Sequence, residues 1–415
     1  MSTIPGPTPA ELEAAREVVS RVAEVTPMES SRFLAELLGF PVHMKCENLQ
    51  RTGSYKIRGA YNRISALTEE ERARGVVAAS AGNHAQGVAL AARELGIGAT
   101  IFMPKGVPLP KLQATRNYGA QVRLDGHSVE ELLRAAAEYA EQTGAIFIPP
   151  FDHADVIAGQ GTLGLEIFDQ VPEAETIIVP IGGGGLISGV AAAAKHRAAA
   201  EGREIRVIGV QAANSAPYPV SLEAGEVTTI KTSPTIADGI AVARPGALNF
   251  EIIKELVDEV VTVTEDDIAR ALVVLLERAK LVVEPAGAVG VAAILAGHVR
   301  ATGPTVVILS GGNIDPMLMQ TVVSHGLVAS DRYLTLSIPL PDRPGQLARI
   351  SELIAHANAN VIEVLHTRHG SGLQIGQVEL KISVETRGSE HRDLVLDTLR
   401  EAGYEPRIGD AEARR

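Results

Sequence analysis

Short apolar segments and helical segments alternate along most of this 415-residue chain. A strand that is buried on both faces reads as a continuous apolar run, and a crossover helix joins it to a parallel neighbour. We therefore expect an α/β protein in which helices cover both faces of a parallel sheet. The strands are predicted at Val76–Ala79, Ala99–Met103, Gln121–Leu124, Ala145–Ile148, Thr176–Pro180, Ile205–Val210, Glu259–Val263 and Thr305–Leu309. The helices among them include Asn83–Leu95, Leu109–Tyr118, Ser128–Gln142 and Asp266–Ala279.

The pattern changes after Ser330. There the residues from Tyr333 to Ile338 alternate between apolar and polar, as in a half-exposed strand. The predicted order of the following elements is helix, strand, strand, helix and short strand, at Gln346–Asn358, Val361–Thr367, Leu373–Glu385, His391–Ala402 and Glu405–Ile408. This βαββαβ order is that of a ferredoxin-like unit. We expect one domain over residues 1–328 and a second, small domain over residues 332–410.

The composition excludes several classes of protein. The net charge is −12 and aromatic residues make up 3% of the chain, with no Trp, so neither basic patches nor stacking platforms for nucleic acid are expected. The single cysteine, Cys46, excludes a disulfide framework and a cysteine-based zinc site. The 40 glycines instead indicate tight turns and close backbone approaches.

The N-terminal segment carries a helix signal and no export signal. Residues 1–10 are polar and rich in proline, without the charged start and apolar core of a signal peptide. Thr8 is a predicted helix cap, Pro9 suits the first helical position and Glu11 completes a capping box, so a helix is expected as far as about Glu24. No apolar run approaches the roughly 18 residues of a membrane span. A reduced, cytoplasmic enzyme without a membrane partner is the expectation.

Lys56 is the first candidate for catalysis. It follows a polar, glycine-containing loop and opens a helix whose apolar residues are Ile57, Ala60, Tyr61 and Ile64. The positive end of a helix dipole disfavours a charged lysine, and a lysine with a lowered pKa is a candidate Schiff-base nucleophile. A lone lysine is more often a solvated surface residue, so the assignment depends on the motifs that accompany it.

Two glycine-rich turns follow strands farther along the chain. Gly182, Gly183, Gly184 and Gly185 lie between the strand Thr176–Pro180 and a helix, where backbone N–H groups can converge on a phosphate. Their spacing fits neither the dinucleotide fingerprint nor a Walker loop, and a purely structural turn is the alternative. The second turn, Ser310-Gly311-Gly312-Asn313, directly follows the strand Thr305–Leu309, where open α/β sheets bind ligands.

Four motifs together resemble a known family. Ser54-Tyr55-Lys56, the Ser80-Ala81-Gly82-Asn83-His84 turn, the tetraglycine loop and the Ser310–Asn313 turn occur in order, as in fold-type II pyridoxal-phosphate enzymes. Within that group the chain most resembles threonine ammonia-lyase (threonine dehydratase), with Thr235–Val242 and Glu284–Ala288 as further matching segments. The resemblance covers roughly residues 8–328. It implies two open parallel-sheet subdomains, the smaller inserted at about residues 77–154.

The resemblance also implies roles for individual residues. Lys56 would bind pyridoxal 5'-phosphate covalently and later abstract the Cα proton. Ser310 would face the pyridine nitrogen, and Asn83 would bind the phenolic oxygen. The phosphate would be held by Gly182, Gly183, Gly184, Gly185 and Leu186. The substrate carboxylate would be held by Ser80, Ala81, Gly82, Asn83 and His84. Gly239 and Glu284 would line the substrate end, although Glu284 could merely start a helix and Asn83 could be a cap.

The implied reaction is β-elimination of water from L-threonine to 2-oxobutanoate and ammonia, in isoleucine synthesis or threonine catabolism. L-Serine should be a slower substrate, because a contact of methylene size discriminates by about 1–3 kcal/mol. Two alternatives stay open. One is a serine racemase or serine ammonia-lyase on the same scaffold, and the other is a non-catalytic amino-acid sensor.

Two further expectations concern a metal and the C-terminal domain. Related enzymes use an acidic residue for a cation where this chain has Gln211, and a neutral amide is a poor ligand, so no metal is expected. The C-terminal unit with Asp342-Arg343-Pro344-Gly345 resembles an ACT domain, in which Gly345 would leave room for an amino-acid effector such as isoleucine or valine. Such units pair, which implies a homo-oligomer (dimer or tetramer). Alternatively, the domain only stabilises the oligomer and binds no effector.

Overall fold

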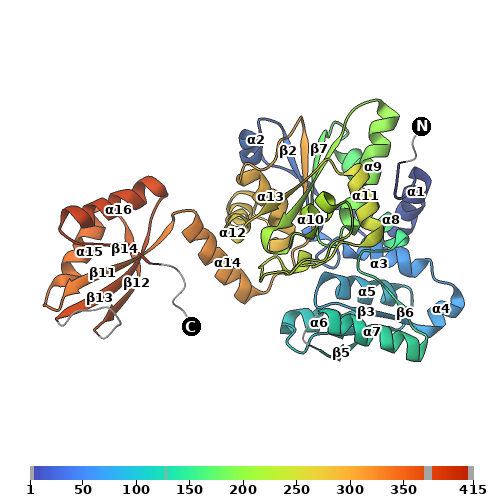
Figure 1. Ribbon diagram of the computed structural model, residues 1–415, viewed down its shortest axis with the longest axis horizontal. Helices are drawn as coiled ribbons and strands as arrows, with labels where there is room; N and C mark the ends of the chain where they lie inside the picture. The colour runs from blue at the N-terminus through green and yellow to red at the C-terminus, as the bar shows by residue number, and fades with distance from the viewer. Residues whose placement is uncertain (1–3, 127–128, 369–375, 410–415) are drawn as a thin grey trace. The chain divides into compact units, whose positions relative to one another are not determined.

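The computed structural model of the protein describes residues 4–126, 129–368 and 376–409 (Figure 1). Its chain divides into two compact units, residues 1–316 and 317–415. The first unit contains two parallel sheets with separate cores, and the second contains one antiparallel sheet with its own core. This confirms the predicted fold class of two parallel-sheet subdomains followed by a ferredoxin-like unit.

The large sheet has the strand order β1-β2-β10-β7-β8-β9. The strand bounds, in that order, are Met28–Ser30, Val42–Lys45, Thr305–Ile308, Thr176–Pro180, Arg206–Ala212 and Glu259–Val263. All pairings are parallel except that of β1 with β2. Figure 1 shows helices on both faces. The helices α2, α12 and α13 (Arg32–Leu38, Glu265–Val274, Pro285–Leu295) lie opposite α8, α9 and α11 (Ala154–Gln170, Gly185–Glu201, Ala247–Leu256).

The small sheet has the order β5-β4-β3-β6 and is parallel throughout. Its strands are Gln121–Leu124, Ala99–Met103, Val76–Ala79 and Ile146–Phe147. Successive side chains of β3 enter different cores, because neighbouring residues of a strand point to opposite faces. Val76 and Ala78 pack toward α5 (Asn83–Glu94), whereas Val77 and Ala79 pack toward α7 (Val129–Thr143). The helix α6 (Leu109–Asn117) packs beside α5 and β5.

The helix α3 (Lys56–Ser65) packs between the two sheet systems, against α5 on one side and α8 on the other. Glycines permit this close approach. A Cβ at Gly87 of α5 would lie 3.1 Å from the carbonyl carbon of Lys56, and one at Gly59 of α3 would lie 2.9 Å from Val156 of α8. The first turn of α3 is therefore held at the junction of the two sheets.

Some element boundaries differ from the sequence expectation. Thr8, Pro9 and Glu11 form the predicted capping box, but α1 (Pro9–Val19) ends five residues before Glu24. The helix predicted as far as Ala279 ends at Val274 and continues as a π-helix, Leu275–Ala279. The predicted strands included neither β1 nor β2. Further helices are α4, α10 and α14 (Glu69–Arg74, Pro217–Ala224, Pro316–Ala329), and 3-10 turns occupy Glu47–Leu49, Ala213–Ser215 and Asp238–Ile240.

The second unit has an antiparallel sheet in the order β12-β13-β11-β14. Its strands are Asn360–Thr367, Gln377–Glu385, Tyr333–Pro341 and Arg407–Ile408, and its helices are α15 (Gln346–His356) and α16 (Ser389–Glu401). Both helices pack on one sheet face through a core that includes Leu336, Ile350 and Leu399. The βαββαβ order is the predicted one, although the predicted start of β13 at Leu373 lies outside the described residues.

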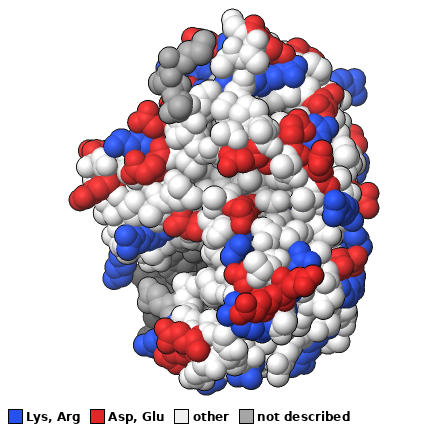
Figure 2. Space-filling model, turned by 90° about the vertical axis from the view of Figure 1, so that its right-hand side faces the viewer, with Lys and Arg blue, Asp and Glu red and all other residues white. Residues whose placement is uncertain are grey.

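The surface carries charges of both signs. On the face drawn in Figure 2, acidic and basic side chains are interspersed among neutral ones. Within the residues that the structure describes, no helix has the length and apolar character needed to cross a bilayer.

Candidate active site

Lys56 is the first residue of α3, as the sequence indicated. Its Nζ donates a hydrogen bond of 2.9 Å to the carbonyl of Pro150 and lies 5.1 Å from the centre of the Tyr55 ring. Burial lowers the pKa of Lys56 to about 8, against the opposing effect of the Glu284 carboxylate. A larger fraction of this amine is therefore uncharged near neutral pH than of an ordinary lysine, and the uncharged amine is the form that nucleophilic and base chemistry require.

A buried ion-pair network anchors α3 immediately beyond Lys56. The guanidinium of Arg58 is fully buried, with contacts of 2.8 Å to Glu47 and 2.6 Å to Glu166. Lys45 of β2 forms a second ion pair of 2.8 Å with Glu166. Buried charges are tolerated only when they are paired in this way, and such pairs favour one geometry. The network joins β2, α3 and α8 and so fixes the start of α3.

The tetraglycine loop connects β7 to α9. Gly184 is the N-cap of α9 with φ +103°, and a Cβ there would collide with the Tyr218 hydroxyl. That hydroxyl donates a 2.9 Å hydrogen bond to the carbonyl of Gly183. Among the described residues, the N–H groups of residues 182–186 donate to no hydrogen bond of the protein. Unpaired amides at the N-terminus of a helix are a binding site for a phosphate group.

The segment Pro150–Phe151 lies between the tetraglycine loop and Lys56. Pro150 accepts the Lys56 hydrogen bond, and the Phe151 ring lies against the Cα of Gly183. A Cβ at Gly185 would lie 2.9 Å from the Phe151 carbonyl oxygen. This segment therefore brings the glycine loop and the lysine, which are far apart in sequence, to one site.

The Ser80–His84 turn follows β3 and opens α5. Ser80 Oγ accepts a 3.1 Å hydrogen bond from the amide of Gly82, and a Cβ at Gly82 would meet no atom within 4 Å. His84 is buried and bonded to the Ile148 carbonyl at 2.9 Å. Burial, assisted by the Lys56 charge, lowers the pKa of His84 to about 3, so its ring is neutral at physiological pH. The turn thus has an open side that small ligands can reach.

Asn83 and Glu284 meet although they are separated by 201 positions, with Asn83 Nδ2 donating to Glu284 Oε1 at 2.6 Å. Asn313 Nδ2 donates to Asn83 Oδ1 at 2.9 Å and to the Thr52 carbonyl at 2.7 Å. Burial, followed by the Asp238 charge, raises the pKa of Glu284 to about 7. Of the two alternative roles, Glu284 is indeed the N-cap of α13, whereas the N-cap of α5 is Gly82 and Asn83 is the first residue of that helix. Both side chains in addition contact each other at the centre of the site.

Ser310 is buried at the end of β10, beside the loop that carries Lys56. Its carbonyl accepts from the amide of Tyr55 at 3.2 Å, and Ser54 forms a β-bridge with Gly311. A Cβ at Gly311 would lie 3.1 Å from Asn83 Nδ2 and would collide with Glu284. Gly239 is adjacent as well, since its Cβ would lie 3.7 Å from Glu284 Oε1. The Ser310–Asn313 turn therefore joins the Lys56 loop to the Asn83–Glu284 pair.

Gln211 is fully buried in β8 with both ends of its amide occupied. Its Nε2 donates to the Ile181 carbonyl at 3.3 Å, and its Oε1 accepts from the amide of Tyr218 at 3.0 Å. In the described part of the chain, no group of three or more His, Cys, Asp or Glu side chains is placed to hold a metal ion.

The structure also brings to the site residues for which no role was predicted. Asn313 links Asn83 to the Lys56 loop, and its place in a polar glycine turn at a strand end was a usable signal. The buried hydroxyl of Ser54 has no hydrogen-bond partner among the described residues. Lys111 and Asp238 form an ion pair of 2.8 Å near Glu284, which no sequence pattern indicated.

A family model described as "Pyridoxal-phosphate dependent enzyme" matches residues 19–311. This chain belongs to that family. The L-threonine ammonia-lyase of Thermotoga maritima is 47% identical over 399 residues, which are 96% of this chain and 98% of that protein. The catabolic L-threonine dehydratase TdcB of Escherichia coli K12 is 47% identical over 307 residues, 73% of this chain and 92% of that protein. The resemblance to threonine ammonia-lyase is thus confirmed.

A solved structure from the comparison has a fold similar to that of this chain. The structure of maize serine racemase has a TM-score of 0.72 and 36% identity, covering 78% of this chain and 98% of that one. The residues of the site fit pyridoxal phosphate, because the unpaired amides of the glycine loop suit a phosphate and the Lys56 amine suits an aldehyde. The chemistry that this group supplies when bound is acidification of the Cα–H bond of an amino acid.

Proposed function

We propose that the chain catalyses the β-elimination of water from L-threonine. The C–OH bond at Cβ and the C–H bond at Cα break, and the resulting enamine hydrolyses to 2-oxobutanoate and ammonia. The observation that carries the proposal is the similarity to an L-threonine ammonia-lyase along nearly the whole of both chains. The convergence of Lys56, the glycine loop and the Asn83–Glu284 pair supports it.

The site residues have distinct proposed roles. Lys56 attaches the cofactor and afterwards removes the Cα proton, which its pKa of about 8 suits. The amides of residues 182–186 hold the phosphate, Asn83 binds the phenolic oxygen, and the Ser80–His84 turn binds the substrate carboxylate. Ser310 faces the pyridine nitrogen, where a hydroxyl, unlike a carboxylate, does not enforce a protonated ring. Gly239 and Glu284 line the substrate end.

The test is a side-by-side assay of L-threonine and L-serine for 2-oxo acids. We expect kcat/KM for threonine to exceed that for serine about 10–100-fold, as one methyl contact permits. Borohydride should bleach the yellow protein and tag Lys56. Lys56→Ala should abolish turnover, whereas the exposed Lys105→Ala, as a matched control, should keep it. A colourless protein that takes up no pyridoxal phosphate, or turnover in Lys56→Ala, would contradict the proposal.

The second candidate function is racemisation of serine, which the similarity to maize serine racemase favours. Chiral analysis of the serine incubation separates the two. Formation of D-serine faster than 2-oxo acid from either substrate would replace the first proposal by the second.

We further propose that residues 1–328 form the catalytic domain, with the small subdomain at about 77–154, and that residues 332–410 form an ACT-like regulatory domain. The Escherichia coli relative matches 73% of this chain and 92% of its own length, which supports a division into a catalytic part and an additional part. We propose that it binds an amino-acid effector at Gly345 and pairs in a homo-oligomer. A cytoplasmic location is proposed as well, with the lone Cys46 as its support.

A further inference from the structure

Lys111 and Asp238 form an ion pair between the two sheet systems of the first unit. Lys111 lies on α6 beside the small sheet, and Asp238 starts the 3-10 turn Asp238–Ile240 beside the large sheet. Their Nζ and Oδ2 atoms are 2.8 Å apart. The Lys111 side chain is only 16% exposed, although Asp238 is 57% exposed. An exposed pair contributes little to stability, but one charge of this pair has lost most of its water.

The helix α6 is also held at its other end. Tyr118, its C-cap, donates a hydrogen bond of 3.3 Å from Oη to the carbonyl of Arg51, in the loop that leads to Lys56. The helix is therefore tied to the large-sheet side by one contact at each end. If either contact opened, α6 would keep its packing on α5 and β5 but would be less firmly held to the large-sheet side.

The ion pair also borders the proposed substrate end. Gly239 directly follows Asp238, and its Cβ would lie 3.7 Å from Glu284 Oε1. Asp238 raises the pKa of Glu284 and Lys111 lowers it, so both charges act on this carboxyl from close by. Moving α6 away would remove the Lys111 charge from the site and free the turn that carries Gly239.

We propose that Lys111 and Asp238 are positioning residues that fasten α6 to the Asp238–Ile240 turn and keep the substrate end of the site closed around the amino acid. This inference rests on the proposed function for the identity of the substrate. Neither residue acts on the reacting atoms. They act through Gly239 and Glu284, whose positions determine how tightly a substrate side chain is enclosed.

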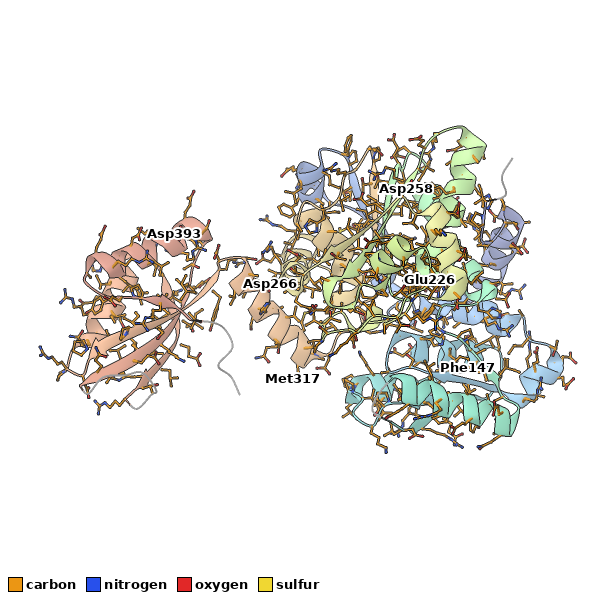
Figure 3. All side chains as sticks on the ribbon, in the orientation of Figure 1. Phe147, Glu226, Asp258, Asp266, Met317 and Asp393 are labelled. Carbon is orange, nitrogen blue, oxygen red and sulfur yellow. The ribbon has the colours of Figure 1, made fainter. Side chains whose placement is uncertain are left out.

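The test compares Lys111→Met and Asp238→Asn in the holoenzyme with a matched control pair. Lys195 and Asp258 are also 2.8 Å apart and similarly exposed, at 22% and 34%. Figure 3 shows Asp258 on the large-sheet side, well separated from Phe147 of the small sheet. We expect KM for threonine to rise about tenfold in Lys111→Met and Asp238→Asn, with kcat changed less than about threefold, and neither value to change in Lys195→Met.

Two further measurements separate positioning from a general structural effect. Hydrogen–deuterium exchange of residues 109–117 should be faster in Lys111→Met without substrate and unchanged in Lys195→Met. The charge swap Lys111→Asp with Asp238→Lys should recover at least half of the lost affinity. In the unmutated enzyme, added salt should raise both KM and this exchange rate, because salt screens exposed charges.

An unchanged KM in both single variants, or a parent enzyme whose KM and exchange in residues 109–117 do not respond to salt, would overturn the positioning role. Failure of the proposed function is distinguishable, since the parent enzyme would then not convert threonine at all. Even in that case, the exchange measurement on the parent and on Lys111→Met would decide whether the ion pair fastens α6.

Discussion

Glu284 is a carboxyl group in a place that disfavours its charge. It is 5% exposed, and burial together with Asp238 raises its pKa to about 7, although Asn83, Lys111 and Lys56 oppose the shift. The Glu284 charge in turn adds to burial in raising the pKa of the neighbouring Tyr55. Below pH 7 the carboxyl is mostly protonated, and it then carries no negative charge toward the amino-acid substrate.

The raised pKa of Glu284 predicts a pH-dependent stability. The proton is bound more tightly in the folded than in the unfolded chain, so this stabilisation is complete below about pH 4.5 and is lost as the pH rises through 7. Glu284→Gln keeps the oxygen that accepts from Asn83 and removes the titration. The free energy of unfolding of this variant, relative to the parent, should therefore increase by about 3 kcal/mol from pH 5 to pH 8 in urea titrations. Parallel pH profiles of the two proteins would contradict the assigned pKa.

Motif residues could be predicted from the sequence, but their partners could not. Lys56 is recognisable because it follows a polar loop and opens a helix, and Ser310 because it begins a polar glycine turn at the end of a strand. The contact of Asn83 with Glu284 spans 201 positions and depends on how two sheets pack, which no local pattern encodes. The lowered pKa of Lys56 was predicted only in part. The sequence indicates the helix end at Lys56, but it does not indicate the burial that is the largest cause of the shift.

At the scale of elements, the two glycines at the ends of α9 are predicted to differ in their effect on cofactor binding. Gly184 and Gly202 both have positive φ, of +103° and +65°, at the N-cap and C-cap of this helix. A Cβ at Gly184 would collide with the Tyr218 hydroxyl and lie 2.8 Å from the Asn249 Cβ, whereas one at Gly202 would meet nothing within 4 Å. Gly184→Ala should weaken pyridoxal-phosphate binding at least about tenfold, because the loop amides must move.

Gly202→Ala is the matched control at the other end of the same helix. It should cost only the backbone strain of about 1 kcal/mol in urea unfolding and leave the cofactor affinity unchanged. An absorbance titration with pyridoxal phosphate measures both variants. Equal cofactor affinities for the two variants would show that the glycine loop does not hold the phosphate.

Elements were predictable where local signals and burial agree. Strands such as β3 and β7 stand out as apolar runs because every one of their residues is buried between covering helices. The strand β1 has three residues, none of them buried, and therefore no such signal. The end of α12 was missed for another reason, since the helical periodicity continues through the π-helix and only the backbone bonding changes.

At the scale of the whole molecule, the chain forms two units, each with its own hydrophobic core. The Escherichia coli dehydratase matches 92% of its own length to 73% of this chain, so a sizeable part of this chain lies outside that match. The C-terminal unit has a complete ferredoxin-like core of its own, and a glycine, Gly345, lies at the start of α15, where the effector site is proposed.

The proposed effector site predicts a difference between two glycines of the C-terminal unit. Gly345 and Gly403 have φ of +90° and +85°, and a Cβ at either would meet nothing within 4 Å. Substitution by alanine should therefore cost a similar strain of about 1 kcal/mol at both positions.

Isoleucine or valine should bind the parent enzyme in calorimetry and change its threonine kinetics. Gly345→Ala should weaken that binding at least about tenfold, because the added Cβ occupies space the effector needs, while Gly403→Ala should not. Equal effects of the two substitutions, or no binding of either amino acid to the parent, would remove the regulatory role for these ligands.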